Sequence, residues 1–166
     1  MTVTRNRALA TLVAAVTAAD WVSKAWVQNR LPVDGWHTVV DGWVVFTHRR
    51  NTGVAFSMFA GGGESWLRLL ALTLAGVVGI VVCVHLIRTT HDRLLHFAAA
   101  LVVAGAMGNL GDRLLNGAVT DFILVRFFPF VFNVADVAIT VGGILLALRL
   151  GLAGEPRQGP PEPTPA

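Results

Sequence analysis

The chain has 166 residues, of which 54% are hydrophobic and only 14% are charged, and its mean hydropathy is +0.63. Soluble domains carry about 25% charged residues, so this composition excludes an ordinary water-soluble domain and indicates an integral membrane protein. The net charge of +3 comes from scattered Lys and Arg residues that form no basic stripe. This pattern argues against a nucleic-acid partner and fits attraction to anionic headgroups of a phospholipid membrane.

The first apolar segment predicts a membrane-spanning helix at residues 8–28. Its basic start and its small residues up to Ala19 also fit a cleavable signal peptide, so that alternative stays open. The helical pattern nevertheless continues past Asp20 and is long enough for a span of roughly 20 residues. Asp20 and Lys24 are four positions apart, so they share one helix face and can form an ion pair.

Residues 30–63 are predicted to form a small extracytoplasmic β-hairpin at the membrane surface. The segment contains two Asp-Gly turn signatures, and the stretch at 43–47 is rich in strand-forming residues. The glycines at 61–63 are expected to let the segment move as a cover over a cleft. The residues expected to anchor the hairpin at headgroup depth are Trp36, Trp43 and Phe46.

The remaining apolar segments predict three further membrane-spanning helices, at residues 66–87, 94–111 and 134–150. Small residues at Ala104 and Gly108 would let a neighbouring helix approach closely. Four spans place both termini on one side of the membrane, and the segments at 30–63 and 112–133 on the other. The basic residues divide almost evenly between the two sides, so the positive-inside rule does not choose an orientation.

Together these features predict an all-α integral membrane protein with four transmembrane helices and a small β-hairpin element. It would form one domain at residues 1–153, followed by a disordered, Pro-rich cytoplasmic tail at 154–166. Cys83 is the only cysteine, which excludes an internal disulfide, and its apolar surroundings favour a small packed hydrophobic residue. The five histidines show no metal-ligand spacing, so neither a metal nor another cofactor is expected.

Two carboxylates, Asp121 and Asp136, lie at the ends of neighbouring membrane elements and are expected to meet. Ionisable residues this close to lipid are costly and usually mark a functional site. Asn133 is a candidate N-cap that places Asp136 in a first helical turn, where the helix dipole favours the ionised form. The apolar neighbours of Asp121 favour its protonated form. Such a pair suits acid–base catalysis with an activated water, although capping alone also explains Asp136.

Other polar residues nearby have two interpretations each. Asn109 and Arg113 are one helical turn apart and could donate hydrogen bonds to a peptide carbonyl. Alternatively, Asp112 and Arg113 form a solvated ion pair at a helix end. Asn51 is either a site residue or part of a turn.

Five segments in this order resemble the motifs of bacterial lipoprotein signal peptidase (signal peptidase II), a family of membrane aspartyl peptidases. The resemblance extends from about residue 8 to residue 150. The five segments are residues 20–24, 51–57, 108–113, 119–123 and 132–136.

The resemblance implies removal of the signal peptide from diacylglyceryl-modified prolipoproteins, with cleavage just before the lipidated cysteine. It also implies a site at the outer face of the bacterial inner membrane, cytoplasmic termini and a monomer without cofactors. By motif match, Asp121 and Asp136 are the catalytic pair. The residues implied to contact substrate or support the pair are Asn51, Gly108, Asn109, Arg113 and Asn133, and those implied to hold the helices in place are Asp20, Lys24 and Asp112.

The chain departs from the family pattern at several positions. None of these departures removes a charged or amide group from the expected site, so they bear on the fine specificity for substrates rather than on activity. Two rival functions remain open at this stage. A proton-conducting transporter subunit would spread its carboxylates along the membrane normal, and a scaffolding protein would use its aspartates only as helix caps. The departures are Val54, Met107, Gly111, Thr120 and Val137.

Overall fold

The computed structural model describes residues 2–52 and 65–153. It contains four helices that are long and apolar enough to cross a membrane, as predicted. The expectations for the glycine linker and for the C-terminal tail fall on residues 53–64 and 154–166, outside the described residues. The helices are α1 (Thr2–Arg30), α2 (Ser65–Thr89), α3 (Arg93–Asn116) and α4 (Val134–Ala153).

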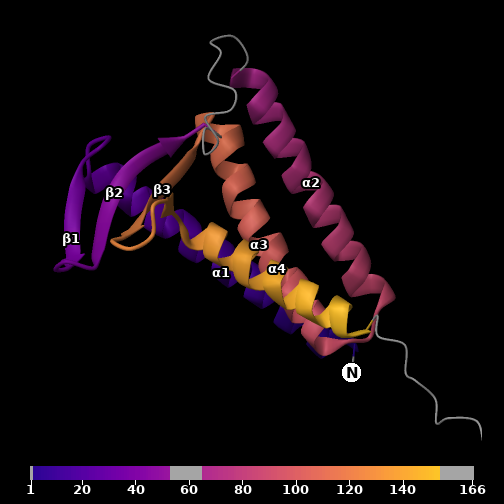
Figure 1. Ribbon diagram of the computed structural model, residues 1–166. Coiled ribbons are helices and arrows are strands. Elements are labelled where there is room, and N and C mark those ends of the chain that lie inside the picture. The colour runs from indigo at the N-terminus through magenta and orange to yellow at the C-terminus, as the bar shows by residue number, and fades with distance from the viewer. Residues whose placement is uncertain (1, 53–64, 154–166) are drawn as a thin grey trace, which may run out of the picture.

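Helix α3 is the centre of the bundle and packs against the other three helices (Figure 1). Small side chains make this possible: Ala104 is fully buried, and a Cβ on Gly105 would collide with the carbonyl oxygen of Ala135 on α4. Cys83 on α2 is buried against Ala99 and Val103 of α3, which confirms that it packs as a small hydrophobic residue. Close helix approach along α3 was therefore predictable from its small residues.

The predicted β-hairpin is present, but it is half of a larger sheet. Four antiparallel strands are paired in the order β1–β2–β3–β4, at the end of the bundle away from the N-terminus (Figure 1). The first turn contains Gly42 at φ 71°, a left-handed conformation that favours glycine. The strands are β1 (Trp36–Val40), β2 (Val44–Asn51), β3 (Val119–Val125) and β4 (Val131–Phe132).

Helix α3 extends to Asn116, whereas the sequence predicted its end at residue 111. Gly111 does not end the helix; its missing Cβ leaves room for the indole ring of Trp21, which a Cβ would approach to 2.7 Å. The helix ends instead at Gly117, which has φ 68° and donates its N–H to the carbonyl oxygen of Arg113. Consequently Asp112 lies on the helix rather than in an extracytoplasmic loop.

Trp36 and Trp43, two of the three predicted membrane anchors, are exposed. Phe46 is half-buried and packs edge-on against Phe122, with ring centroids 5.5 Å apart. The exposed aromatic partner of Trp43 is Phe127, at 6.3 Å in an edge-on contact. The depth of the three anchors in a membrane stays a prediction.

Candidate active site

A buried polar cluster lies where α1, α3, the start of α4 and the sheet meet. Its members come from parts of the chain far apart in sequence, and each is less than a tenth exposed. Buried polar groups must be paired, so the partners of each one define the geometry of the site. The cluster consists of Asp20, Lys24, Asn109, Asp112, Asp121 and Asn133.

The N-terminus of α4 is capped twice. The backbone N–H of Asp136 donates to Asn133 Oδ1 at 2.8 Å, and the Asn133 N–H donates to Asp136 Oδ2 at 3.2 Å. This reciprocal pair confirms the predicted N-cap. A further helix N–H, that of Ala135, donates to Asp20 Oδ1 at 2.9 Å. Asp20 thus caps α4 from across the bundle.

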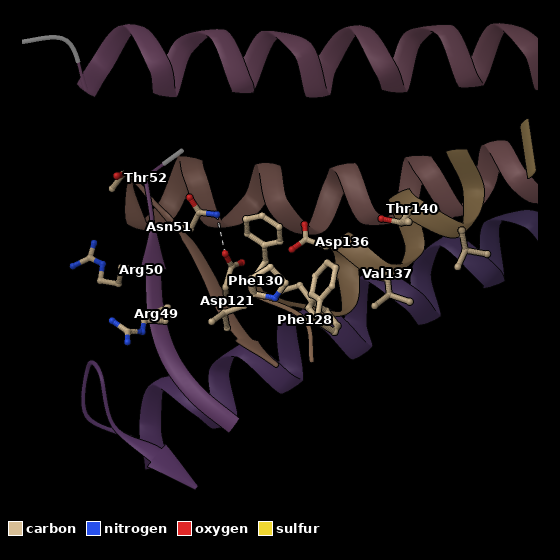
Figure 2. A pocket seen from close by; sticks show the side chains of 14 residues that line it. Arg49, Arg50, Asn51, Thr52, Asp121, Phe128, Phe130, Asp136, Val137 and Thr140 are labelled. Carbon is tan, nitrogen blue, oxygen red and sulfur yellow. Dashed lines mark hydrogen bonds between the residues drawn. The ribbon is translucent and has the colours of Figure 1, made fainter. Parts of the chain in front are cut away.

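Asp121 on β3 is 3% exposed and accepts a hydrogen bond at each oxygen. Asn133 Nδ2 donates to Oδ1 at 2.7 Å, and Asn51 Nδ2 donates to Oδ2 at 2.8 Å, the bond drawn in Figure 2. Burial raises the pKa of Asp121 to about 6, and the neighbouring Asp136 charge adds to the rise, whereas the two amide donors oppose it. The direction predicted from its apolar neighbours is therefore confirmed.

Asp121 and Asp136 line the same cleft, which has a volume of about 780 Å³ (Figure 2). Asn133 links them directly, because its amide donates to Asp121 while its oxygen caps the Asp136 N–H. Aromatic side chains, Phe128 and Phe130, form part of the opposite wall. The two carboxylates thus converge on one cleft, as the acid–base interpretation requires. A proton path would instead spread them along the membrane normal.

The amide of Asn109 directs one N–H at Asp136, because its Nδ2 donates to Asp136 Oδ1 at 2.8 Å. A contact of its second N–H with a substrate carbonyl stays a prediction. Its oxygen accepts from Lys24 Nζ at 3.0 Å and from Asn133 Nδ2 at 3.2 Å. Asn109 therefore supports Asp136 from inside the protein.

Arg113 lies one helical turn from Asn109 and faces a second hollow of about 260 Å³ between α2, α3 and α4. Asp136 also lines this hollow, so it lies between two spaces. Arg113 Nη1 donates to the backbone oxygen of Asn109 at 3.3 Å. This contact uses one donor of the guanidinium, which carries five N–H groups. A guanidinium here can approach a substrate near Asp136.

The interpretation of Asp112 and Arg113 as a solvated ion pair is wrong. Asp112 is 7% exposed, and Oδ2 accepts from the Thr120 N–H at 2.8 Å and lies 3.3 Å from Lys24 Nζ. Because α3 continues beyond Asp112, this carboxylate faces α1 and β3 rather than water. It fixes the strand that carries Asp121 to α3.

Asp20 and Lys24 form the predicted ion pair, with Oδ2 and Nζ 2.7 Å apart. Lys24 is 2% exposed and Asp20 is fully buried. Gly108 makes room for the pair, because a Cβ at that position would lie 2.5 Å from Asp20 Oδ2. Gly108 is therefore a packing residue next to the cluster.

Sequence reasoning missed the part played by Thr120. Its hydroxyl accepts from Gln28 Nε2 at 2.7 Å, and its backbone oxygen accepts from Asn133 Nδ2 at 3.4 Å. Two signals in the sequence pointed to Thr120: it lies beside Asp121, and it is a polar residue where the family commonly has Val.

Three comparisons with known proteins place the chain beside one family. A family model described as signal peptidase (SPase) II matches residues 12–152. "Lipoprotein signal peptidase" of Pseudomonas syringae pv. tomato is 45% identical over 141 residues, covering 81% of this chain and 80% of that protein. The protein of the same name from Pseudomonas fluorescens is also 45% identical and is covered to 82%. A solved bacterial membrane enzyme shares the fold, with a TM-score of 0.79 and 23% identity over 93% of this chain and 94% of that one.

Proposed function

Since this chain belongs to the signal peptidase II family, we propose that it is an aspartyl endopeptidase acting on diacylglyceryl-modified prolipoproteins. The family supports a membrane protease that removes signal peptides from prolipoproteins. The proposal adds cleavage just before the lipidated cysteine, at the outer face of the bacterial inner membrane, with cytoplasmic termini. It needs no metal or other cofactor. Within residues 2–52 and 65–153, no three His, Cys, Asp or Glu side chains are grouped to hold a metal.

The observation that carries the proposal is the convergence of Asp121 and Asp136 on one cleft, joined through Asn133. Two carboxylates in unequal environments can share the acid and base roles. Asp121, whose pKa burial raises to about 6, is suited to hold a proton. Asp136 accepts the N–H of Asn133 and the amide of Asn109, which hold its carboxylate at the cleft.

The chemistry then balances without a cofactor. Asp136 takes a proton from a water whose oxygen attacks the scissile carbonyl carbon, while Asp121 gives its proton to the carbonyl oxygen. When the C–N bond breaks, the leaving amine takes the proton held by Asp136, and the carbonyl re-forms as its proton returns to Asp121. Because both acids belong to one chain, a monomer suffices.

The position of the cleft suits a lipid-modified substrate. Its walls carry exposed apolar side chains, among them Phe128, Val137 and Val141, which can contact acyl chains. The pair lies at the sheet end of the bundle, where water reaches it at the membrane boundary while the apolar signal helix stays in lipid.

The test replaces each acid by its amide and measures cleavage of a lipid-modified precursor. We expect Asp121→Asn and Asp136→Asn each to lower kcat by roughly 1,000-fold or more, since each removes an acid–base group. The side-chain oxygen that Asp136→Asn retains can still accept the Asn133 N–H, so the variant should keep the start of α4. The matched control is Asp92→Asn, which removes an aspartate that caps α3 far from the cleft and should retain activity. Retained turnover in both active-site variants would refute the proposal.

A further inference from the structure

Lys24 touches the network that holds Asp136, although it lies on α1 and lines neither hollow beside that carboxylate. Its ammonium has three oxygen neighbours: Asp20 Oδ2 at 2.7 Å, Asn109 Oδ1 at 3.0 Å and Asp112 Oδ2 at 3.3 Å. The ion pair of Lys24 with Asp112 is enough to hold α1 against α3. The contact with the neutral amide oxygen of Asn109 is different, because the same amide donates to Asp136 in the cleft.

The side-chain amide of Asn109 can adopt two orientations, related by exchange of its oxygen and nitrogen. In the observed one, the oxygen faces the Lys24 ammonium and the NH2 group faces the Asp136 carboxylate. The reverse would direct NH2 at an ammonium and an oxygen at a carboxylate, so both contacts would be repulsive. With a neutral residue at position 24, the oxygen side would keep only the weaker, uncharged donor Asn133 Nδ2, at 3.2 Å.

We propose that Lys24 is a positioning residue of the catalytic pair, which acts through the Asn109 amide to keep a donor on Asp136. This inference rests on the proposed function and goes beyond a role for Lys24 in holding helices together. The ammonium orients the amide, the amide donates to the Asp136 carboxylate, and that carboxylate is the group that takes a proton from water.

Other charged groups around Asp136 are Arg113 from α3 and Asp121 from β3, and those around Lys24 are Asp20 from α1 and Asp112 from α3. Removing Lys24 alone would leave Asp20 without its buried cation. The test variant is therefore the double substitution Asp20→Asn/Lys24→Met, which removes both members of the 2.7 Å ion pair. Asp112 also loses Lys24, but it keeps the Thr120 N–H and the Asn116 amide as donors. Removing both members of a buried pair costs less stability than removing one of them.

In Asp20→Asn/Lys24→Met we expect kcat for the lipid-modified precursor to fall roughly 10- to 100-fold, the effect of losing one hydrogen bond to a charged group. The pH dependence of kcat should also shift, because the carboxylate that takes the proton from water no longer has an oriented amide donor. The matched control is Asp92→Asn/Arg149→Met, which removes an ion pair at the other end of α3 and α4 and should leave the profile unchanged.

A second background separates this action from a purely structural one. In Asn109→Leu, the link to Asp136 is already lost, so adding Asp20→Asn/Lys24→Met should change kcat by less than about threefold. An equal loss in both backgrounds, or an unshifted pH profile, would overturn the inference. Cleavage by the unaltered chain in the same assay keeps the two proposals apart: its absence would contradict the proposed function, whereas an unshifted variant contradicts only this one.

Discussion

Carboxylates join α3 to its neighbours at both ends of the bundle, but the two ends are built differently. At the sheet end, Asp20, Lys24 and Asp112 are nearly inaccessible to water and are linked to the proposed catalytic pair. At the opposite end, Asp92 caps α3 and accepts from Arg149 Nε on α4 at 2.6 Å. The side chains of that opposite-end pair are 23% and 42% exposed.

The difference indicates what each end is for. An exposed ion pair contributes at most about 1 kcal/mol, and a cap about 1 kcal/mol more, which suffices to fix a helix end. Buried charges cost several kcal/mol each and are recovered only through good partners, so packing alone does not favour them. The sheet-end cluster is better explained by the chemistry that it supports, and the predictions below test this contrast.

The largest effect is expected from Asp20→Ala. The substitution removes the closest partner of a buried ammonium and the acceptor of the Ala135 N–H. We expect the free energy of unfolding to fall by about 3–5 kcal/mol, the usual consequence of breaking a buried pair. Thermal unfolding of the purified protein in detergent, with Asp92→Asn as the control, measures it. A loss below about 1 kcal/mol would mean that the two ends do not differ.

The pH dependence of stability should have opposite signs at the two ends. The pKa of Asp121 is raised, mainly by burial, from 3.8 to about 6, so its contribution to stability is full below 3.8 and is lost as pH rises through 6. Relative to Asp121→Asn, the unaltered chain should lose on the order of 2–3 kcal/mol between pH 4 and pH 7. Unfolding midpoints across this range measure the loss, and parallel curves would contradict it.

Asp92 should behave in the reverse way. Hydrogen bonds from the start of α3, chiefly from Leu95, and the nearby Arg149 hold the pKa of Asp92 below its usual value. Its contribution is therefore present above pH 3.8 and is lost only as pH falls through the lowered pKa. Asp92→Asn should therefore lower stability evenly at neutral pH and flatten the acid side of the stability curve, which unfolding midpoints across the pH range measure.

An intermediate effect is expected midway between the two ends, where α3 and α4 touch through glycine. A Cβ on Gly142 would lie 2.6 Å from the carbonyl oxygen of Ala98, whereas a Cβ on Gly143 would meet nothing within 4 Å. We expect Gly142→Ala to cost about 1–3 kcal/mol by overpacking. Gly143→Ala should instead gain up to about 1 kcal/mol from helix propensity. Equal unfolding temperatures for the two variants would contradict the close approach.

Local patterns predicted those parts of the site whose partners are near in sequence. The Asp20–Lys24 pair follows from a spacing of four, and the Asn133–Asp136 cap from a spacing of three. The four helical spans and the first hairpin follow from hydropathy and turn residues. The convergence of Asp121 and Asp136 was inferred from their places at the ends of adjacent elements and from the family's motif order.

Contacts between distant segments were not predictable in the same way. The role of Asp112 depends on where α3 ends. The sequence predicted that end at residue 111, whereas Gly111 lies within the helix and leaves space for Trp21. The packing of Phe46 against Phe122 depends on the pairing of β2 with β3, which shifts register between Phe46 and Arg49. The Asn109 side-chain oxygen accepts a hydrogen bond from Lys24, which lies 85 positions away in the sequence. No local periodicity carries such information.

The smallest effect is expected from Arg149→Met, which opens the opposite-end pair and leaves the Asp92 cap intact. Asp92 still accepts from the N–H groups of Leu94 and Leu95, at 2.8 and 3.1 Å, so only the ion pair is lost. Because both charges reach solvent, we expect a loss of no more than about 1 kcal/mol, and this loss should shrink as salt is added. Cleavage should be unchanged, since Arg149 contacts neither carboxylate of the cleft. Unfolding temperatures at low and high salt test the first point. A salt-insensitive loss of several kcal/mol would show that the opposite end is as demanding as the cluster, and the contrast between the two ends would then no longer distinguish chemistry from packing.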